Sequence, residues 1–206
     1  MNEYAFLAVI AGILLIGAMS PGPSFLVVAR NSLSQSRAHG IATAFGTGLG
    51  VMFFAILASY GVTALIDQVP AAYLGFKIFG GLYLLFLAFK IWSGATSPLA
   101  IQKSDGVQAM TINRAFVLGL MTQTSNPKTA LVIAGIFAAF VPAVPPPHTT
   151  WLVAVIAFVI DFSWYAMVAV SLSTARSRDV YRAAKTGFDR VASGFLGVVG
   201  IKLLLD

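Results

Sequence analysis

The chain has 206 residues, of which 58% are hydrophobic and only 10% are charged. A soluble domain carries about 25% charged residues, so this composition excludes an ordinary soluble protein and indicates that lipid is the solvent. The chain has a net charge of +6 and no cysteine, which excludes disulfides, thiol redox chemistry, thiolate metal sites and lipid attachment to cysteine.

Six apolar segments follow one another along the chain, most of them long enough to cross a bilayer as a helix. Their apolar runs are continuous rather than alternating, which predicts helices and not a β-barrel. The first segment has no basic start, and its small-residue site AMS (18–20) is followed by Pro21, so the segment is predicted to be an uncleaved span and not a signal peptide. The sequence therefore predicts an all-α, polytopic membrane protein with a single integral membrane domain over 1–206. The six segments cover residues 4–29, 40–64, 70–92, 114–141, 149–174 and 190–205.

Basic residues gather in alternate connections between these segments. Ten of the 13 Lys and Arg residues lie in or beside the first, third and fifth connections, half of them between the fifth and sixth segments. The positive-inside rule places these connections in the cytoplasm and both termini outside. The basicity is thus a topology signal and not a nucleic-acid site, although the run RSRDVYRAAK (176–185) is also suited to anionic lipid head groups.

The two halves of the chain are similar to each other at an offset of 105 residues. A polar linker at about 93–112, predicted to be cytoplasmic, separates halves at about 1–92 and 113–206. At this offset SPGPSFLVVA (20–29) falls on SNPKTALVIA (125–134), and both stretches contain a proline break. Because each half has three spans, the copies would be inverted, an arrangement typical of secondary transporters. The prediction is two inverted three-helix repeats with proline-interrupted helices 1 and 4.

The prolines at these breaks suggest a binding site. Proline frees the carbonyl four residues earlier, and Pro21, Pro23 and Pro127 would each do so at membrane depth. Free carbonyls can accept from an ammonium group, and the helix that resumes after each break offers N–H groups to a carboxylate. The pair of breaks therefore suits a zwitterion. The alternative is a kink that only shapes packing.

Nearly the whole chain resembles the LysE/RhtB family of bacterial amino-acid exporters. The resemblance rests on SPGPSFLVVARNSLSQSRAHGIATAFGTGLG (20–50), TQTSNPKTALVIAGIF (122–137) and DFSWY (161–165). It implies a carrier of the bacterial inner membrane, driven by an ion gradient, whose partners are a small amino-acid substrate, a coupling ion and the lipid bilayer. It implies neither a particular substrate nor an oligomeric state, so a homodimer stays open. No cofactor is expected.

Two charged residues lie near the centre of predicted spans. A lone charge there costs at least about 3 kcal/mol, so Lys128 and Asp161 should face one another, directly or across a cavity. Their function is then to bind substrate and to carry the coupling proton; the alternative is a pair that fixes helix registry. The predicted substrate-binding residues are Ser20, Pro21, Gly22, Pro23, Ser24, Gln123, Asn126, Pro127, Lys128 and Trp164, and Asp161 is the predicted proton-coupling residue.

Other classes of function fit less well. The sequence shows no nucleophile beside a base and no carboxylate cluster for a metal, which argues against an enzyme. A channel or exporter for a cation or another small metabolite is the alternative function. A multivalent cation would be poorly neutralised, since Asp161 is the only acidic residue well inside a predicted span. The stretch GTGLG (46–50) is interpreted as a groove for close helix packing.

Overall fold

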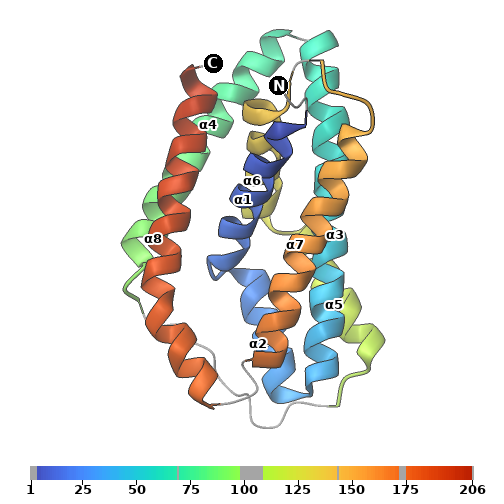
Figure 1. The fold of residues 1–206 in the computed structure, drawn as a ribbon, viewed down its shortest axis with the longest axis vertical. Coiled ribbons are helices and arrows are strands. Elements are labelled where there is room, and N and C mark those ends of the chain that lie inside the picture. The colour runs from blue at the N-terminus through green and yellow to red at the C-terminus, as the bar shows by residue number, and fades with distance from the viewer. Residues whose placement is uncertain (1–3, 69, 98–108, 143, 172–174, 206) are drawn as a thin grey trace.

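A computed structural model describes residues 4–68, 70–97, 109–142, 144–171 and 175–205 (Figure 1). Every regular element in these ranges is an α-helix, which confirms the predicted all-α class. The helices are α1 (Ala5–Met19), α2 (Pro23–Ser34), α3 (Arg37–Gln68), α4 (Pro70–Gly94), α5 (Ile112–Thr124), α6 (Pro127–Phe140), α7 (Thr149–Ser171) and α8 (Ala175–Leu205).

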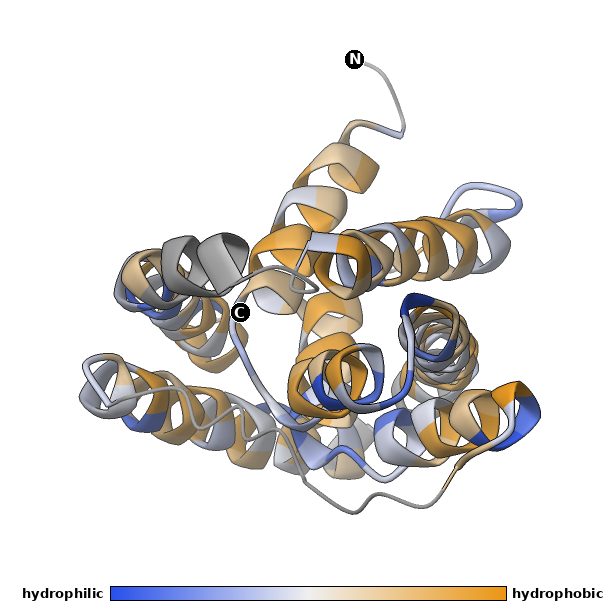
Figure 2. Cartoon of the chain, turned by 90° about the horizontal axis from the view of Figure 1, so that it is seen from below, coloured by the Kyte–Doolittle hydropathy of each residue, from blue (hydrophilic) through white to orange (hydrophobic). Residues whose placement is uncertain are grey.

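Several helices are suited to cross a membrane. Within the described residues α3, α4 and α7 are each long and apolar enough, and α1 and α2 together form a fourth apolar path bent by 57°. Hydrophobic residues make up much of the helices (Figure 2). Large apolar side chains also point outward, such as Phe79 and Phe89 of α4, which are 76% and 71% exposed. An exposed apolar surface of this kind is stable in lipid and not in water, so the chain is a polytopic membrane protein.

Proline residues begin new helices at both predicted breaks. After α1 the backbone is extended at Ser20 and Gly22, and α2 starts with Pro23. After α5 the side chain of Asn126 accepts a hydrogen bond from the Lys128 amide at 3.1 Å, and α6 starts with Pro127. Proline favours the first helical position because its missing N–H has no partner to lose there. The interruptions predicted in the first and fourth segments are therefore present.

The last helix is longer than predicted. The expected segment began at residue 190, whereas α8 begins at Ala175 and takes in the basic run that was assigned to a connection. Two of its charged residues, Lys185 and Asp189, are buried and form an ion pair of 2.8 Å. The pair lies four residues apart on one helix face, so each charge has a partner where apolar patterning alone would end the span.

The helices pack around a central group made of α1, α2 and α6 (Figure 1). Helix α3 packs along α5 and α7, and α4 packs along α8. Helices α3 and α6 end, and α4 and α7 begin, at one end of the molecule, which also holds the start of α1 and the end of α8 (Figure 1). Helices α2 and α7 end, and α3, α5 and α8 begin, at the other end (Figure 1). We call it the basic end because Arg37, Arg114 and the basic run of α8 come at the starts of these helices.

Glycines bring α3 and α5 into backbone contact. A Cβ atom added at Gly46 would lie 2.2 Å from the Phe116 carbonyl oxygen, and one added at Gly50 would lie 2.6 Å from the Gln123 Cβ. On the facing helix, a Cβ at Gly119 would lie 2.1 Å from the Thr43 carbonyl oxygen. The close helix packing predicted for GTGLG is confirmed. It fixes the position of α5, the helix that ends at the second break.

Candidate functional site

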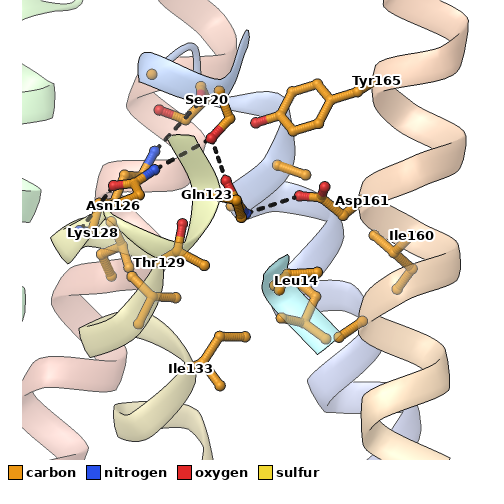
Figure 3. A pocket seen from close by; sticks show the side chains of 18 residues that line it. Leu14, Ser20, Gln123, Asn126, Lys128, Thr129, Ile133, Ile160, Asp161 and Tyr165 are labelled. Atoms are coloured by element: carbon orange, nitrogen blue, oxygen red, sulfur yellow. Dashed lines mark hydrogen bonds between the residues drawn. The ribbon is translucent and has the colours of Figure 1, made fainter. Parts of the chain in front are cut away.

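The two helix breaks meet at a cavity of about 60 Å³ near the centre of the bundle (Figure 3). Helices α1, α2, α3, α5, α6, α7 and α8 all contribute side chains to its wall. One part of the wall is aliphatic, with Leu14 and Ile133. The polar part comes from the two breaks and from α7, and consists of Ser20, Ser24, Gln123, Asn126, Lys128, Thr129, Asp161 and Tyr165.

Hydrogen bonds connect one break to the other. The Ser24 hydroxyl donates to Oε1 of Gln123, and Nδ2 of Asn126 donates to the Ser24 hydroxyl at 3.4 Å. Nζ of Lys128 donates to the carbonyl oxygen of Ser20 at 3.4 Å. The start of α2 is thus bonded to the end of α5 and the start of α6. The two breaks are therefore in direct contact with one another.

Asp161 brings a carboxyl group to the opposite side of the cavity. Its Oδ1 accepts a hydrogen bond from Nε2 of Gln123 at 3.4 Å. Its Oδ2 is buried, and no hydrogen bond to it is found among the described residues. The nearby Thr47 interacts with this carboxyl group, although its hydroxyl bonds the Ala44 carbonyl at 2.9 Å. One carboxyl oxygen is therefore buried without a hydrogen bond from the described residues.

Lys128 and Asp161 lie on opposite sides of this cavity, with Gln123 between them (Figure 3). Within the described part of the chain they form no ion pair with each other. The acidic group that acts electrostatically on Lys128 is instead Asp189 of α8. Of the two arrangements expected from the sequence, the structure therefore has the one across a cavity.

Asp189 is a buried acid that the sequence analysis missed. Only 4% of it is exposed, and its Oδ1 accepts a hydrogen bond from the Ser20 hydroxyl at 3.0 Å, directly at the first break. Asp161 is the only acid well inside a predicted span, but Asp189, which lies just before the predicted sixth span, is a second acid buried in the bundle. One signal in the sequence could have indicated this burial. Lys185 and Asp189 lie four residues apart beside an apolar segment, and such an ion pair can be buried because it is neutral overall.

A family model places the chain among known proteins. The model described as LysE type translocator matches residues 15–206. The chain belongs to this family. The resemblance inferred from the sequence is confirmed, and the protein is a translocator of the bacterial inner membrane and not an enzyme.

Curated relatives match this LysE type translocator over most of its length. It is 26% identical over 198 residues to the threonine efflux protein of Escherichia coli strain K12, covering 96% of each chain. The threonine efflux protein of Salmonella typhi is equally similar, at 26% over 198 residues. An uncharacterized membrane protein, YahN, of Escherichia coli K12 is 28% identical over 95% of this chain and 87% of its own. No solved structure matches the chain.

The predicted site residue Trp164 lies away from the central cavity of the translocator. Its ring packs edge-on against Phe188, with the ring centroids 6.0 Å apart. Tyr165 lines the cavity in its place. At 3.6 residues per turn, Tyr165, four positions after Asp161, lies about 40° from it around the helix. Trp164, three positions after Asp161, lies about 60° away on the other side. Trp164 is on the side that faces α8, which corrects its assignment to the cavity wall.

The prolines of the translocator line a second cavity. Pro21, Pro23 and Pro127 border a space of about 390 Å³ between the breaks, α4 and α8. The predicted site residues are thus divided between two neighbouring cavities, and three of them, Gly22, Asn126 and Lys128, line both. Among the described residues no group of three His, Cys, Asp or Glu side chains is placed to hold a metal ion.

Proposed function

We propose that this translocator exports a small amino acid, or a close analogue, from the cytoplasm in exchange for an entering proton. The observation that carries the proposal is the central cavity, where Lys128, at the second helix break, and Asp161, on α7, bring an ammonium group and a carboxyl group to opposite walls. The names of the threonine efflux relatives support the amino-acid class, and threonine is the first substrate to test.

The polar wall is suited to both charges of a zwitterion. Lys128 can bind the substrate carboxylate, together with the first N–H groups of α2, which no side chain caps. Asp161 and Gln123 can accept from the substrate ammonium group. Ser20, Ser24, Gly22 and Asn126 complete the proposed site, and Pro21, Pro23 and Pro127 hold the breaks in shape. These assignments are proposals that site-directed variants can test.

The size of the cavity favours a small substrate. At about 10–15 Å³ for each water molecule, about 60 Å³ holds only a few waters. The described conformation therefore leaves only a small space beside the breaks, and loading a substrate requires the breaks to separate. This expansion is the conformational change that alternating access needs.

We further propose that six spans form two inverted repeats. In this arrangement α1 with α2, and α5 with α6, are each one interrupted span. The helix boundaries support it: α1 and α5 end 105 residues apart, at Met19 and Thr124, and α4 and α8 begin 105 residues apart, at Pro70 and Ala175. The distribution of Lys and Arg supports a cytoplasmic basic end with both termini outside.

Asp161 is the proposed proton carrier. Export of a neutral zwitterion gains nothing from the membrane potential alone, whereas exchange for one proton gains about 2.3 kcal/mol per 100 mV. This energy corresponds to a concentration ratio of about 50. Oδ2, which accepts no hydrogen bond from the described residues, provides a place for the proton, and Gln123 links the carboxyl group to the second break.

The test is an Asp161→Asn variant in cells loaded with threonine-containing dipeptides. We expect the variant to insert normally but to lose accumulation of threonine outside against its gradient, while passive threonine exchange continues. Asp161→Glu, which retains an acid, should keep part of the driven export. If Asp161→Asn exports against the gradient with an unchanged dependence on external pH, the proton assignment is wrong.

A further inference from the structure

A second cavity lies directly beside the breaks. We call this space of about 390 Å³ the vestibule; it lies between the breaks, the last turns of α4 and the first half of α8. Its charged lining residues are Lys90, Lys128, Lys185 and Asp189. Lys90 is exposed at its edge, whereas Lys185 and Asp189 are buried. The vestibule therefore carries both signs of charge close to the central cavity.

Lys185 has a structural task that uses all its hydrogen-bond donors. Its ammonium group donates to the carbonyl oxygens of Gly94 and Ala95 at 3.1 Å each, and to Oδ2 of Asp189 at 2.8 Å. An ammonium group has three N–H donors, so none is left for a ligand. Lys185 thus joins the end of α4 to α8 and holds Asp189 in place.

Lys128 and Asp189 retain binding capacity. Among the described residues Lys128 makes one side-chain hydrogen bond, to the Ser20 carbonyl, and has two further donors. The Asp189 carboxylate accepts one bond from Lys185 and one from Ser20, out of about four acceptor positions. A donor with spare N–H groups and an acceptor with spare lone pairs therefore face the same space.

Ser20 bonds to both of these groups. Its carbonyl oxygen accepts from Lys128, and its hydroxyl donates to Asp189. Ser20 lines the central cavity, and Lys128 lines the central cavity and the vestibule alike. This chain of contacts is consequently the partition between the two spaces, and it has to break before a solute can pass.

We propose that the vestibule is a loading site for a zwitterionic amino acid, in which Asp189 binds the ammonium group and Lys128 binds the carboxylate. Occupancy draws both side chains away from Ser20, which opens the partition toward the central cavity. The proposal rests on the proposed export function. It adds a substrate-binding residue, Asp189, and a positioning residue, Lys185.

The absence of cysteine makes a labelling test direct, because a single introduced cysteine is the only thiol. Ile91→Cys places a thiol in the vestibule wall. Ser36→Cys places a thiol on the exposed surface directly before α3, at the basic end, as a control for access and membrane orientation. A charged, membrane-impermeant thiosulfonate is applied to inside-out and right-side-out vesicles. Both variants should react from the same side.

L-threonine is the probe for occupancy. At ten times its dissociation constant it should slow labelling of Ile91→Cys about tenfold, because only the unoccupied fraction reacts, and leave Ser36→Cys unchanged. 1-Amino-2-propanol lacks the carboxylate and 3-hydroxybutyrate lacks the amine, so neither should protect at that concentration. Protection by either one alone would overturn recognition of a zwitterion.

The role of Asp189 is tested in the Ile91→Cys background. Asp189→Asn should abolish protection by L-threonine, and Asp189→Glu should restore part of it. The labelling rate without threonine, and a single elution peak, show that each variant keeps its fold. Full protection in Asp189→Asn would overturn the proposal.

Failure of this proposal and failure of the proposed function are distinguishable. If the unmodified protein exports threonine but Ile91→Cys is not protected, the loading site is wrong and the export function stands. If threonine protects Ile91→Cys but no amino acid is exported, the loading site stands as a binding site and the export function is wrong.

Discussion

Replacing Gly119 with alanine should separate α5 from α3 and disturb the central cavity at a distance. A Cβ at this position would lie 2.1 Å from the Thr43 carbonyl oxygen and 2.9 Å from its carbonyl carbon. Close carbon–oxygen contacts lie at about 3.3–3.6 Å, so the backbones must move apart by about 1.2 Å or more. Both neighbours are backbone atoms, so no side-chain rotation can make the space.

The displacement would reach the site through Gln123, one helical turn further along α5. The Gln123–Asp161 hydrogen bond is already 3.4 Å long and would be lost on such a shift. Overpacking typically costs about 1–3 kcal/mol, against which the helix preference of alanine over glycine returns at most about 1 kcal/mol. A misplacement of about 1 Å in a working site reduces rates by about 100-fold.

Gly12 provides the matched control, because a Cβ there would meet nothing within 4 Å. Unfolding in SDS measures stability, and threonine efflux from dipeptide-loaded cells measures function. We expect Gly119→Ala to unfold at lower SDS and to lose most export, and Gly12→Ala to do neither. If Gly119→Ala unfolds and exports like the unmodified protein, the α3–α5 contact is not as close as described and does not position Gln123.

Three further outcomes are expected. Gly22→Leu should abolish export at normal expression, because its side chain would occupy the space between the breaks. Gly22→Ala should be tolerated, since its Cβ would lie 3.9 Å from Nζ of Lys128. Equal export by both variants would contradict this prediction. Lys185→Met should destabilise the protein in SDS by about 3–5 kcal/mol, because Asp189 loses its buried partner, and adding Asp189→Leu should recover stability while export stays lost. An alkaline phosphatase fused to the C-terminus should be active, because the proposed topology places the C-terminus outside and the enzyme is active only after export. An inactive fusion, together with an active cytoplasmic reporter at the same position, would refute the proposed topology.

The features that could be predicted from the sequence depend on local chemistry. Proline restricts its own backbone whatever surrounds it, so the breaks before Pro23 and Pro127 were foreseeable. The packing groove at Gly46 and Gly50 was predictable for the same reason, since a residue without a side chain lets the backbone of a neighbouring helix come close, whichever helix that is.

The features that were missed depend on how helices dock. Asp189 follows a basic run, and its burial arises from the packing of α8 along α4, which places the α4 carbonyls against Lys185. No local pattern contains that information. Trp164 and Tyr165 were similarly indistinguishable in sequence, because each lies within one turn of Asp161 and only the position of α8 decides which of them reaches the cavity.

The two buried acids differ in a way that assigns them different tasks. Asp189 is held by an ammonium group at 2.8 Å, so its charge has a permanent partner and it offers a fixed negative end to an arriving ammonium group. Asp161 contacts a neutral amide through one oxygen, and its other oxygen has no bond among the described residues, so its proton can come and go without breaking an ion pair. In the proposed exchange Asp189 binds the arriving substrate and Asp161 carries the proton, so the two roles fall to two different acids. Ser20 connects the first acid to the partition and Gln123 connects the second to the break, so each is one hydrogen bond away from the element that has to move.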